Sequence, residues 1–284
     1  MKLITWNIQW ARGLDGNVDP ARIARTARAI ADFDVLCLQE VAVNFPGLEG
    51  SRGEDQVAAL AQALPGYGTH FGAAVDVDDG RGGRSLLGNL VVSRLPVTQV
   101  FRHLLPWPAQ AGVRSMQRLA LEAVVRTSAA DLRVLTTHLE YYSAVQRMAQ
   151  VDALRALHEQ AGAHAAAPGA DDGAGSPFAR RPRPLSAILT GDFNFEPGSP
   201  EYVRLTAPAG AAALPFLDAW TVAHGNAPHV PTAGVHENSW APRPLACDFV
   251  FVTADLAPRV RRVQADLATR DSDHQPLLVE LDGP

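Results

Sequence analysis

Thr190-Gly191-Asp192-Phe193-Asn194 follows an apolar run at residues 185–189 and precedes a Pro/Gly-rich segment at residues 197–200. This pattern predicts a buried strand that ends abruptly in a loop. Asp192 and Asn194 are two residues apart, so in an extended chain their side chains point to the same side. A carboxylate and a carboxamide placed in this way can hold a water molecule and a phosphate oxygen together. The simpler alternative is a turn after a strand, because Gly, Asp and Asn are common turn formers.

The length and composition favour a single domain, residues 1–284, with a large core. The chain has 284 residues, of which 47% are hydrophobic, and this is sufficient for one extended core. The formal net charge is -5 and there is no lysine-rich run, so binding of nucleic acid through bulk positive charge is not indicated. Both cysteines, Cys37 and Cys247, lie in apolar runs, and we expect buried free thiols rather than a disulfide.

The sequence shows no pattern typical of export or membrane insertion. Residues 1–8 lead directly into a predicted strand, without the charged and apolar regions of a signal peptide. No apolar run approaches the roughly 18 residues that a membrane-spanning helix requires. We therefore expect a cytoplasmic protein, and we expect it to be a monomer.

Apolar periodicity and turn residues predict a chain rich in strands, with helices in both halves. Asp19-Pro20 is typical of a helix start, with Asp19 as the N-cap and Pro20 in the first turn. Ser51–Glu54 and Ser143–Gln146 match the capping-box pattern, which predicts a helix after each. Strands are predicted at residues 2–8, 35–39 (stopping at Glu40), 68–75, 89–93, 97–103, 117–126, 132–137, 185–189, 249–253, 260–265 and 276–281, and helices after residue 19, after residue 54, at 146–160 and after Ser199.

Two segments do not follow this alternation. Residues 216–220 are ambiguous, and no element is predicted for them. Residues 161–184 are rich in Ala, Gly, Pro and Arg without a period, which predicts a flexible surface insert. Its Arg180–Arg183 run could contact an anionic partner, but a solvated loop is the favoured interpretation. No linker divides the chain, and two packed sheets with helices on both outer faces would bury these elements, which predicts an α/β sandwich of four layers, αββα.

Polar side chains recur where apolar strands are predicted to end. If those strands lie side by side and point the same way, the polar groups meet at one rim, where α/β sheets build ligand sites. Clustered carboxylates raise one another's pKa or need a cation. Hard oxygen donors suit Mg²⁺ or Mn²⁺ rather than zinc. The residues are Asn7, Glu40, His138, Asp192, Asn194, Asp248, Asp273 and His274.

Short motifs in a fixed order carry a resemblance that covers nearly the whole chain. They are Thr5-Trp6-Asn7, Leu38-Gln39-Glu40, Gly191-Asp192-Phe193-Asn194, Cys247-Asp248-Phe249-Val250-Phe251 and Ser272-Asp273-His274, with further matches at Gly88-Asn89-Leu90 to Ser93-Arg94 and at Thr137-His138-Leu139. The chain resembles the endonuclease/exonuclease/phosphatase family, which includes DNase I-like nucleases, abasic-site endonucleases, sphingomyelinases and inositol polyphosphate 5-phosphatases. The resemblance implies a DNase I-like sandwich of two mixed sheets and cleavage of a phosphate ester that depends on Mg²⁺, with Mn²⁺ as a substitute.

The resemblance also implies roles for individual residues. His274 would be the general base that takes a proton from the attacking water, and Asp248 would fix the tautomer of its ring. Glu40 would bind the metal ion. Asn7 and Asp273 would be further residues of the metal site.

Other residues would contact the phosphate. Asp192 and Asn194 would orient the nucleophile and a non-bridging oxygen, and a share of the base role stays open for Asp192. His138 would donate to a phosphoryl oxygen or to the leaving group, unless it is a buried structural histidine. Arg118 fits a phosphate contact and an ordinary surface arginine equally well. Asn89 and Arg94 would support the site from a loop.

The substrate is not specified by these motifs. Trp107 and Trp240 could stack on bases, although a position at the edge of the core is slightly favoured for both. Asn238-Ser239-Trp240 departs from the Thr-Trp or Thr-Phe pair of many family members. A nuclease or other phosphodiesterase is the first hypothesis, with nucleic acid among its substrates. A phosphomonoesterase or a lipid-head-group hydrolase, sphingomyelinase-like or acting on an inositol phosphate, is the alternative. A catalytically silent binding module is the third hypothesis.

Overall fold

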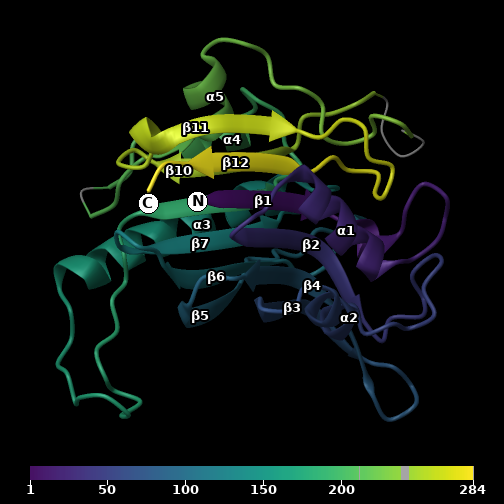
Figure 1. The fold of residues 1–284 in the computed structure, drawn as a ribbon, viewed down its shortest axis with the longest axis horizontal. Helices are drawn as coiled ribbons and strands as arrows, with labels where there is room; N and C mark the ends of the chain where they lie inside the picture. The colour runs from purple at the N-terminus through teal and green to yellow at the C-terminus, as the bar shows by residue number, and fades with distance from the viewer. Residues whose placement is uncertain (211, 238–242, 284) are drawn as a thin grey trace.

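Two six-stranded β-sheets packed face to face form the centre of the molecule (Figure 1). The structure is a computed structural model that describes residues 1–210, 212–237 and 243–283. The first sheet has the order β11-β12-β1-β2-β4-β3 and consists of β1 (Lys2–Asn7), β2 (Val35–Val43), β3 (Gly68–Asp78), β4 (Arg84–Ser93), β11 (Val260–Ala265) and β12 (Leu277–Leu281). The second has the order β5-β6-β7-β8-β10-β9 and consists of β5 (Val97–Leu104), β6 (Leu119–Arg126), β7 (Asp131–His138), β8 (Ala187–Asp192), β9 (Phe216–Asp218) and β10 (Asp248–Thr253).

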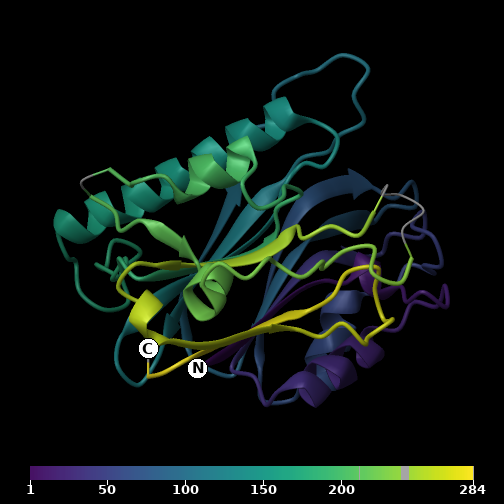
Figure 2. The ribbon, with the colours of Figure 1, turned by 90° about the horizontal axis from the view of Figure 1, so that it is seen from above.

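Helices cover the outer faces of the two sheets. Figure 2 shows the long helix α3 with α4 along one side, and α1 with α2 on the opposite side. The helices are α1 (Pro20–Ile30), α2 (Gln56–Ala63), α3 (Ala144–Ala166), α4 (Pro200–Thr206) and α5 (Ala219–His224), with short 3₁₀ turns η1 (Gln9–Ala11) and η2 (Ala257–Arg259). This arrangement confirms the predicted αββα sandwich.

Three of the predicted helix starts have the expected caps. The side chains of Asp19, Ser143 and Ser199 accept hydrogen bonds from backbone amides three residues further on, which satisfies donors that the first turn leaves open. The prediction of a capping box at Ser51–Glu54 is wrong. Ser51 Oγ donates to Glu54 within the preceding loop, and Asp55 caps α2 by accepting from the amide of Ala58.

Alternation along the strands divides the core into layers. Ile188 of β8 is buried between the two sheets, whereas its neighbour Leu189 is buried with residues of α3. Phe193, Phe249 and Phe251 continue this outer layer, with Phe193 and Phe251 ring centroids 5.1 Å apart. Aromatic packing of Phe193, which follows Asp192, against Phe249, which follows Asp248, therefore fixes the backbone that presents the polar edge.

Several predicted boundaries differ from the structure. Residues 216–220 contain both a strand and a helix, because β9 ends at Asp218 and the Asp218 side chain caps α5. The insert is shorter than predicted, since α3 continues to Ala166 and residues 167–184 alone have no helix or strand. Arg183 is not solvated, because its Nη2 lies 3.2 Å from an oxygen of the buried Glu122 on β6.

Among the described residues, no helix combines the length and the hydropathy needed to cross a lipid bilayer.

Candidate active site

The structure brings all eight predicted site residues to one edge of the sandwich. Six of them line a cleft of about 520 Å³. The other two, Asn7 and Asp248, are buried directly behind the cleft and hydrogen-bond Asp192 and His274 respectively. The six that line the cleft are Glu40, His138, Asp192, Asn194, Asp273 and His274.

The strand directions at this edge differ from the prediction. Asp248 begins β10, which is antiparallel to β8 and places Asp248 directly opposite Asp192. His274 precedes β12, which is antiparallel to β1. Glu40 does not end its strand either, because β2 continues to Val43 and the register shifts around this position. The prediction that each group follows or ends a strand is therefore wrong, and the condition that these strands point the same way is not met. The groups still meet, since starts of antiparallel strands reach the same rim as ends of parallel ones.

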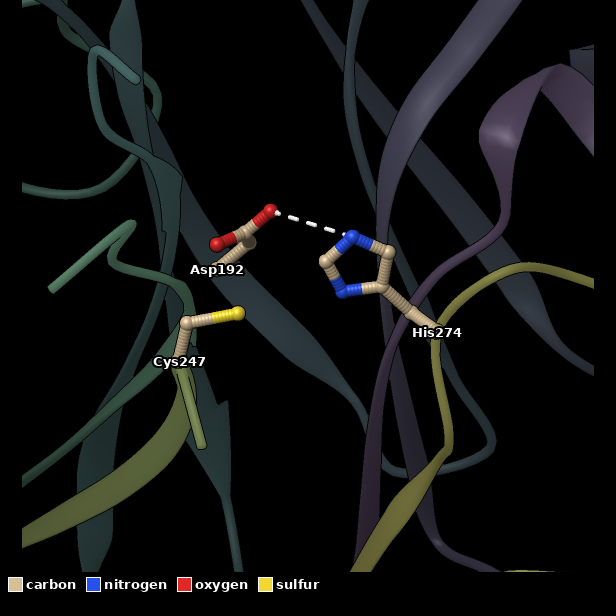
Figure 3. Close-up of side chains that lie close together, drawn as sticks. All are labelled: Asp192, Cys247 and His274. Atoms are coloured by element: carbon tan, nitrogen blue, oxygen red, sulfur yellow. Dashed lines mark ion pairs between the residues drawn. The ribbon is translucent and has the colours of Figure 1, made fainter. Parts of the chain in front are cut away.

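His274 is held between two carboxylates. Its Nδ1 donates to Oδ2 of Asp248 at 2.9 Å, and its Nε2 lies 3.7 Å from Oδ2 of Asp192 (Figure 3). Trp6 fixes the backbone by donating from Nε1 to the carbonyl of His274. Burial alone would lower the pKa of His274, but the charges of Asp248 and Asp192 outweigh it and raise that pKa well above the ordinary value.

Asp192 receives hydrogen bonds on both carboxylate oxygens. Asn7 Nδ2 donates to Oδ2 at 3.0 Å, and the amide of Asn194 donates to Oδ1 at 3.0 Å. Burial nevertheless raises the pKa of Asp192 to about 6, with the charge of Asp248 adding to the effect. Gly191 makes this placement possible: it has φ 140°, and a Cβ there would lie 1.9 Å from the carbonyl oxygen of Thr137 on β7.

His138 is a neutral group on the floor of the cleft. Burial, followed by the charges of Arg118 and His274, lowers its pKa well below the ordinary value. Asn194 Nδ2 lies 3.0 Å from His138 Nε2, so the amide donates and Nε2 accepts. Oδ2 of Asp192 lies 3.4 Å from the same Nε2, and Nδ1 lies 3.7 Å from Oε1 of Glu40.

Glu40 and Asp273 form the acidic side of the cleft. Burial and the charge of Asp273 raise the pKa of Glu40 to about 7, and burial also raises the pKa of Asp273. A buried carboxylate whose charge is disfavoured by a second carboxylate fits a hard divalent cation, which would relieve the repulsion. Asn7 presents Nδ2 to Glu40 at 3.0 Å, while its Oδ1 accepts from the amide of Gln9. The donor set is thus two carboxylates with Asn7 beside them, which suits an ion that keeps several waters.

Arg118 faces this cleft and is not a surface residue. Its side chain is 7% exposed, and Nε lies 3.3 Å from Oε2 of the fully buried Glu140. Its Nη1 is buried and has no hydrogen-bond partner among the described residues, and Arg118 lines the cleft, so the guanidinium keeps a donor that could serve an anion. Glu140 was not predicted from the sequence, although its place two residues after His138 puts it on the same side of the chain.

Other predicted contributors lie away from the cleft. Arg94 pairs with Asp32 and Asp34, next to the start of β2 and therefore at the opposite end of the sheet from Glu40. Asn89 supports the site from inside by donating to the carbonyl of Leu119. Trp107 is half exposed, does not line the cleft and donates to Ser115. Trp240 and the Asn238-Ser239 departure lie outside the described residues.

Two further features of the site were missed in the sequence. Cys247 Sγ lies 3.7 Å from Asp248 Oδ2 behind His274, although the sequence indicated only a buried thiol. The walls of the cleft include Trp10, Tyr141 and Tyr142, with Arg114 lying over the ring of Tyr142 at 5.4 Å. Such walls leave room for a flat or apolar group beside the polar floor.

The chain matches the model of the Endonuclease/Exonuclease/phosphatase family over residues 4–274. No curated protein matches the chain in sequence. An endonuclease/exonuclease/phosphatase from Beutenbergia cavernae has the same fold, with a TM-score of 0.69, 24% identity, and coverage of 99% of this chain and 71% of that one. The Bacteroides thetaiotaomicron mannosyl-6-phosphatase Bt3783 gives 0.65 at 16% identity, covering 99% of each chain. A humanized D. rerio TDP2 with 14 mutations gives 0.62 at 20% identity, covering 99% of this chain and 98% of that one. Because the family match extends over nearly the whole sequence, the protein belongs to the endonuclease/exonuclease/phosphatase family and is a metal-dependent phosphoesterase.

Proposed function

We propose that the protein is a Mg²⁺-dependent phosphodiesterase in which His274 activates the attacking water. The observation that carries this proposal is the position of His274, whose Nδ1 is held by Asp248 while Nε2 faces Asp192 and the cleft. An imidazole fixed by a carboxylate on one nitrogen presents the other nitrogen for proton transfer.

Glu40 and Asp273 would hold the ion, with Asn7 as a further residue of the metal site. Both carboxylates line the cleft, and the charge of Asp273 acts on Glu40. Bound Mg²⁺ would supply neutralisation of the negative charge on the phosphate and on the leaving oxygen. Mn²⁺ offers the same preference for oxygen ligands and is the expected substitute.

The chain's own residues would perform the proton transfer. A water molecule between His274 and Asp192 would lose a proton to His274 Nε2 while its oxygen attacks phosphorus in line with the leaving group. Asp192, held by Asn7 and the Asn194 amide, would orient that water. Phosphorus then gains a bond to the water oxygen as its bond to the leaving-group oxygen breaks, and no covalent enzyme intermediate forms.

Arg118 and His138 would bind the phosphate from the other side. Arg118 lines the cleft, and its Nη1 has no hydrogen-bond partner among the described residues. His138 lines the cleft as well. Both can donate to non-bridging oxygens. The attraction between the guanidinium of Arg118 and the phosphate strengthens as the phosphate oxygens gain charge in the transition state. Asn194 would act mainly by fixing the tautomer of His138.

A diester is favoured over a monoester by the charge of the cleft. Among the described residues that line it, Arg114, Arg118 and His274 can carry positive charge, against four carboxylates, Glu40, Glu140, Asp192 and Asp273. A monoester brings two negative charges near neutral pH and a diester brings one, so the electrostatic cost is lower for the diester. Phosphomonoester hydrolysis is the second candidate, because a mannosyl-6-phosphatase shares the fold at 16% identity.

Hydrolysis of bis(p-nitrophenyl) phosphate and p-nitrophenyl phosphate with Mg²⁺ tests the proposal directly. We expect the diester to have the higher kcat/KM and both reactions to stop in EDTA. A protein that hydrolyses only the monoester would support the second candidate. Single-stranded DNA, abasic duplex DNA, RNA, sphingomyelin and an inositol phosphate then separate the natural substrate classes.

A further inference from the structure

Cys247 places a thiol in a site whose other donors are oxygen and nitrogen. It is 2% exposed and immediately precedes Asp248 at the start of β10. One donor atom from each of Asp192, Cys247 and His274 lies within 4.8 Å of the other two. Figure 3 shows the three side chains directed toward a common space. Hydrolysis as proposed above has no use for the thiol.

These three donors differ from a magnesium site in their chemistry. Mg²⁺ requires hard oxygen ligands and dehydrates reluctantly. Zn²⁺ binds sulfur, nitrogen and carboxylate oxygen at about 2.0–2.3 Å in a tetrahedron, and a thiolate favours such softer ions. We propose that Asp192, Cys247 and His274 form an inhibitory site for a thiophilic divalent cation, Zn²⁺ or Cd²⁺. The inhibition rests on the proposed role of His274 as the base.

The surrounding structure already orients the donors. Asp248 accepts from His274 Nδ1 at 2.9 Å, so Nε2 is the nitrogen that faces Asp192. A carboxylate that holds the far nitrogen of a histidine is the usual support of a zinc-binding imidazole. Asp192 and His274 line the cleft, which gives an ion its entry and a water molecule for the fourth position.

The inhibitory site is separate from the residues proposed for Mg²⁺. The two sites share no ligand, but they are neighbours: Asn7, a further residue of the proposed Mg²⁺ site, donates from Nδ2 to Glu40 Oε1 and to Asp192 Oδ2, at 3.0 Å each. A thiophilic ion on Nε2 would occupy the lone pair that accepts the proton of water. It would therefore block the reaction while Glu40 and Asp273 still hold Mg²⁺, and an excess of Mg²⁺ would not displace it.

Cys37 provides a matched control within the same chain. It is also a buried free thiol, but it lies in the core between the sheets. Among the residues that the structure describes, the only group of three or more His, Cys, Asp and Glu side chains with donor atoms within 4.8 Å of one another is the one that contains Cys247. Replacing Cys37 by Ala therefore removes a buried thiol without touching the inhibitory site.

Direct binding is measured by titrating the Mg²⁺-loaded protein with Cd²⁺ and recording the thiolate-to-cadmium charge-transfer absorption. We expect a band that saturates at one equivalent in the wild type and in Cys37→Ala, and no band in Cys247→Ala. Absence of the band from the wild type, or an equal band in Cys247→Ala, overturns the proposal. This readout requires no turnover, so it stands apart from the proposed function. Cys247→Ser, which keeps the size of the side chain, replaces Cys247→Ala if the latter does not fold.

Inhibition is measured with Zn²⁺ on Mg²⁺-supported turnover, each variant being compared with its own rate without Zn²⁺. Loss of the thiol ligand should raise the half-inhibitory concentration by about tenfold or more in Cys247→Ala, and not in Cys37→Ala. Raising Mg²⁺ should leave inhibition of the wild type unchanged. If excess Mg²⁺ restores the rate and Cys247→Ala is inhibited like the wild type, Zn²⁺ binds at Glu40 and Asp273 and the proposal fails.

Discussion

Asp192 and Asp248 are direct register partners on the antiparallel strands β8 and β10. Their carboxylates consequently flank one imidazole, with His274 2.9 Å from Asp248 and 3.7 Å from Asp192. Two buried carboxylates at such a distance are tolerated because a cationic ring between them offsets their repulsion. The same relationship sets the protonation state on which the proposed reaction depends.

The pH dependence of the rate follows from this relationship. The pKa of His274 is raised, and a general base must be deprotonated, so kcat/KM should rise with pH above the ordinary histidine value of about 6.5. Asp248→Asn removes a charge that raises this pKa, and it should move the acid limb of the profile to lower pH while lowering the maximal rate. Asp218→Asn, which alters a second buried Asp–His pair with His229, is the control. An acid limb that stays in place in Asp248→Asn would argue against His274 as the titrating base.

Removal of the imidazole should lower the rate without unfolding the protein. Loss of a general base costs about 10²–10⁴ in kcat, and His274→Ala is expected to fall in this range on the diester substrate. His224→Ala, an exposed histidine at the end of α5, should retain the wild-type rate. Turnover of His274→Ala comparable to the wild type would assign the base to another group.

Arg118 should contribute to binding of the phosphate and of the transition state. Arg118→Ala removes a charged donor, and kcat/KM should fall by about 10²–10³. Arg118→Lys keeps the charge but not the bond from Nε to Glu140, so it should recover only part of the activity. The control is Arg94→Ala, because Arg94 pairs with Asp32 and Asp34 away from the cleft. Equal kinetics of Arg118→Ala and Arg94→Ala would remove Arg118 from the phosphate site.

Gly191 should be required for folding of the edge that carries Asp192. A Cβ at this position would meet the Thr137 carbonyl at 1.9 Å, and the backbone has φ 140°. Gly191→Ala should therefore lower the free energy of unfolding by about 3 kcal/mol or more. Gly198→Ala has φ 79° and open space around the Cβ, so its cost should be only about 1–2 kcal/mol. Chemical denaturation measures the free energy of unfolding of both variants. Equal losses in Gly191→Ala and Gly198→Ala would contradict the close approach of Gly191 to the Thr137 carbonyl.

The fold could be predicted from the sequence because its motifs lie in or beside apolar strands and follow the order of a known family. The helix starts at Asp19 and Ser143 were also readable, since capping is a local interaction. Ser51 shows the limit of this approach: it matches a capping box, yet its hydroxyl bonds Glu54 within a loop and Asp55 caps the helix. Ser51 accepts from the amide of Gly53 and Asp55 from the amide of Ala58, so the helix begins only after Asp55.

The site residues could be named from the sequence, but their arrangement could not. Strand direction places Asp248 at the start of β10, and this depends on pairing with β8, a segment far away in the chain. The continuation of β2 past Glu40 depends on pairing with β4, where the register shifts. Burial of Arg118 against Glu140 likewise needs two strands to meet. Contacts between distant segments carry no local signal in one sequence.

The dependence of turnover on a divalent ion held by Glu40 tests the central claim most directly. The diester is assayed over a range of Mg²⁺ concentrations with the wild type, Glu40→Gln and, as a control, Glu49→Gln, which alters an exposed glutamate paired with Arg12. We predict no activity in EDTA, recovery with Mg²⁺, and a half-saturating Mg²⁺ concentration that is about tenfold or more higher in Glu40→Gln alone. Full activity in EDTA, or identical Mg²⁺ curves for Glu40→Gln and the wild type, would contradict a metal-dependent site at this edge.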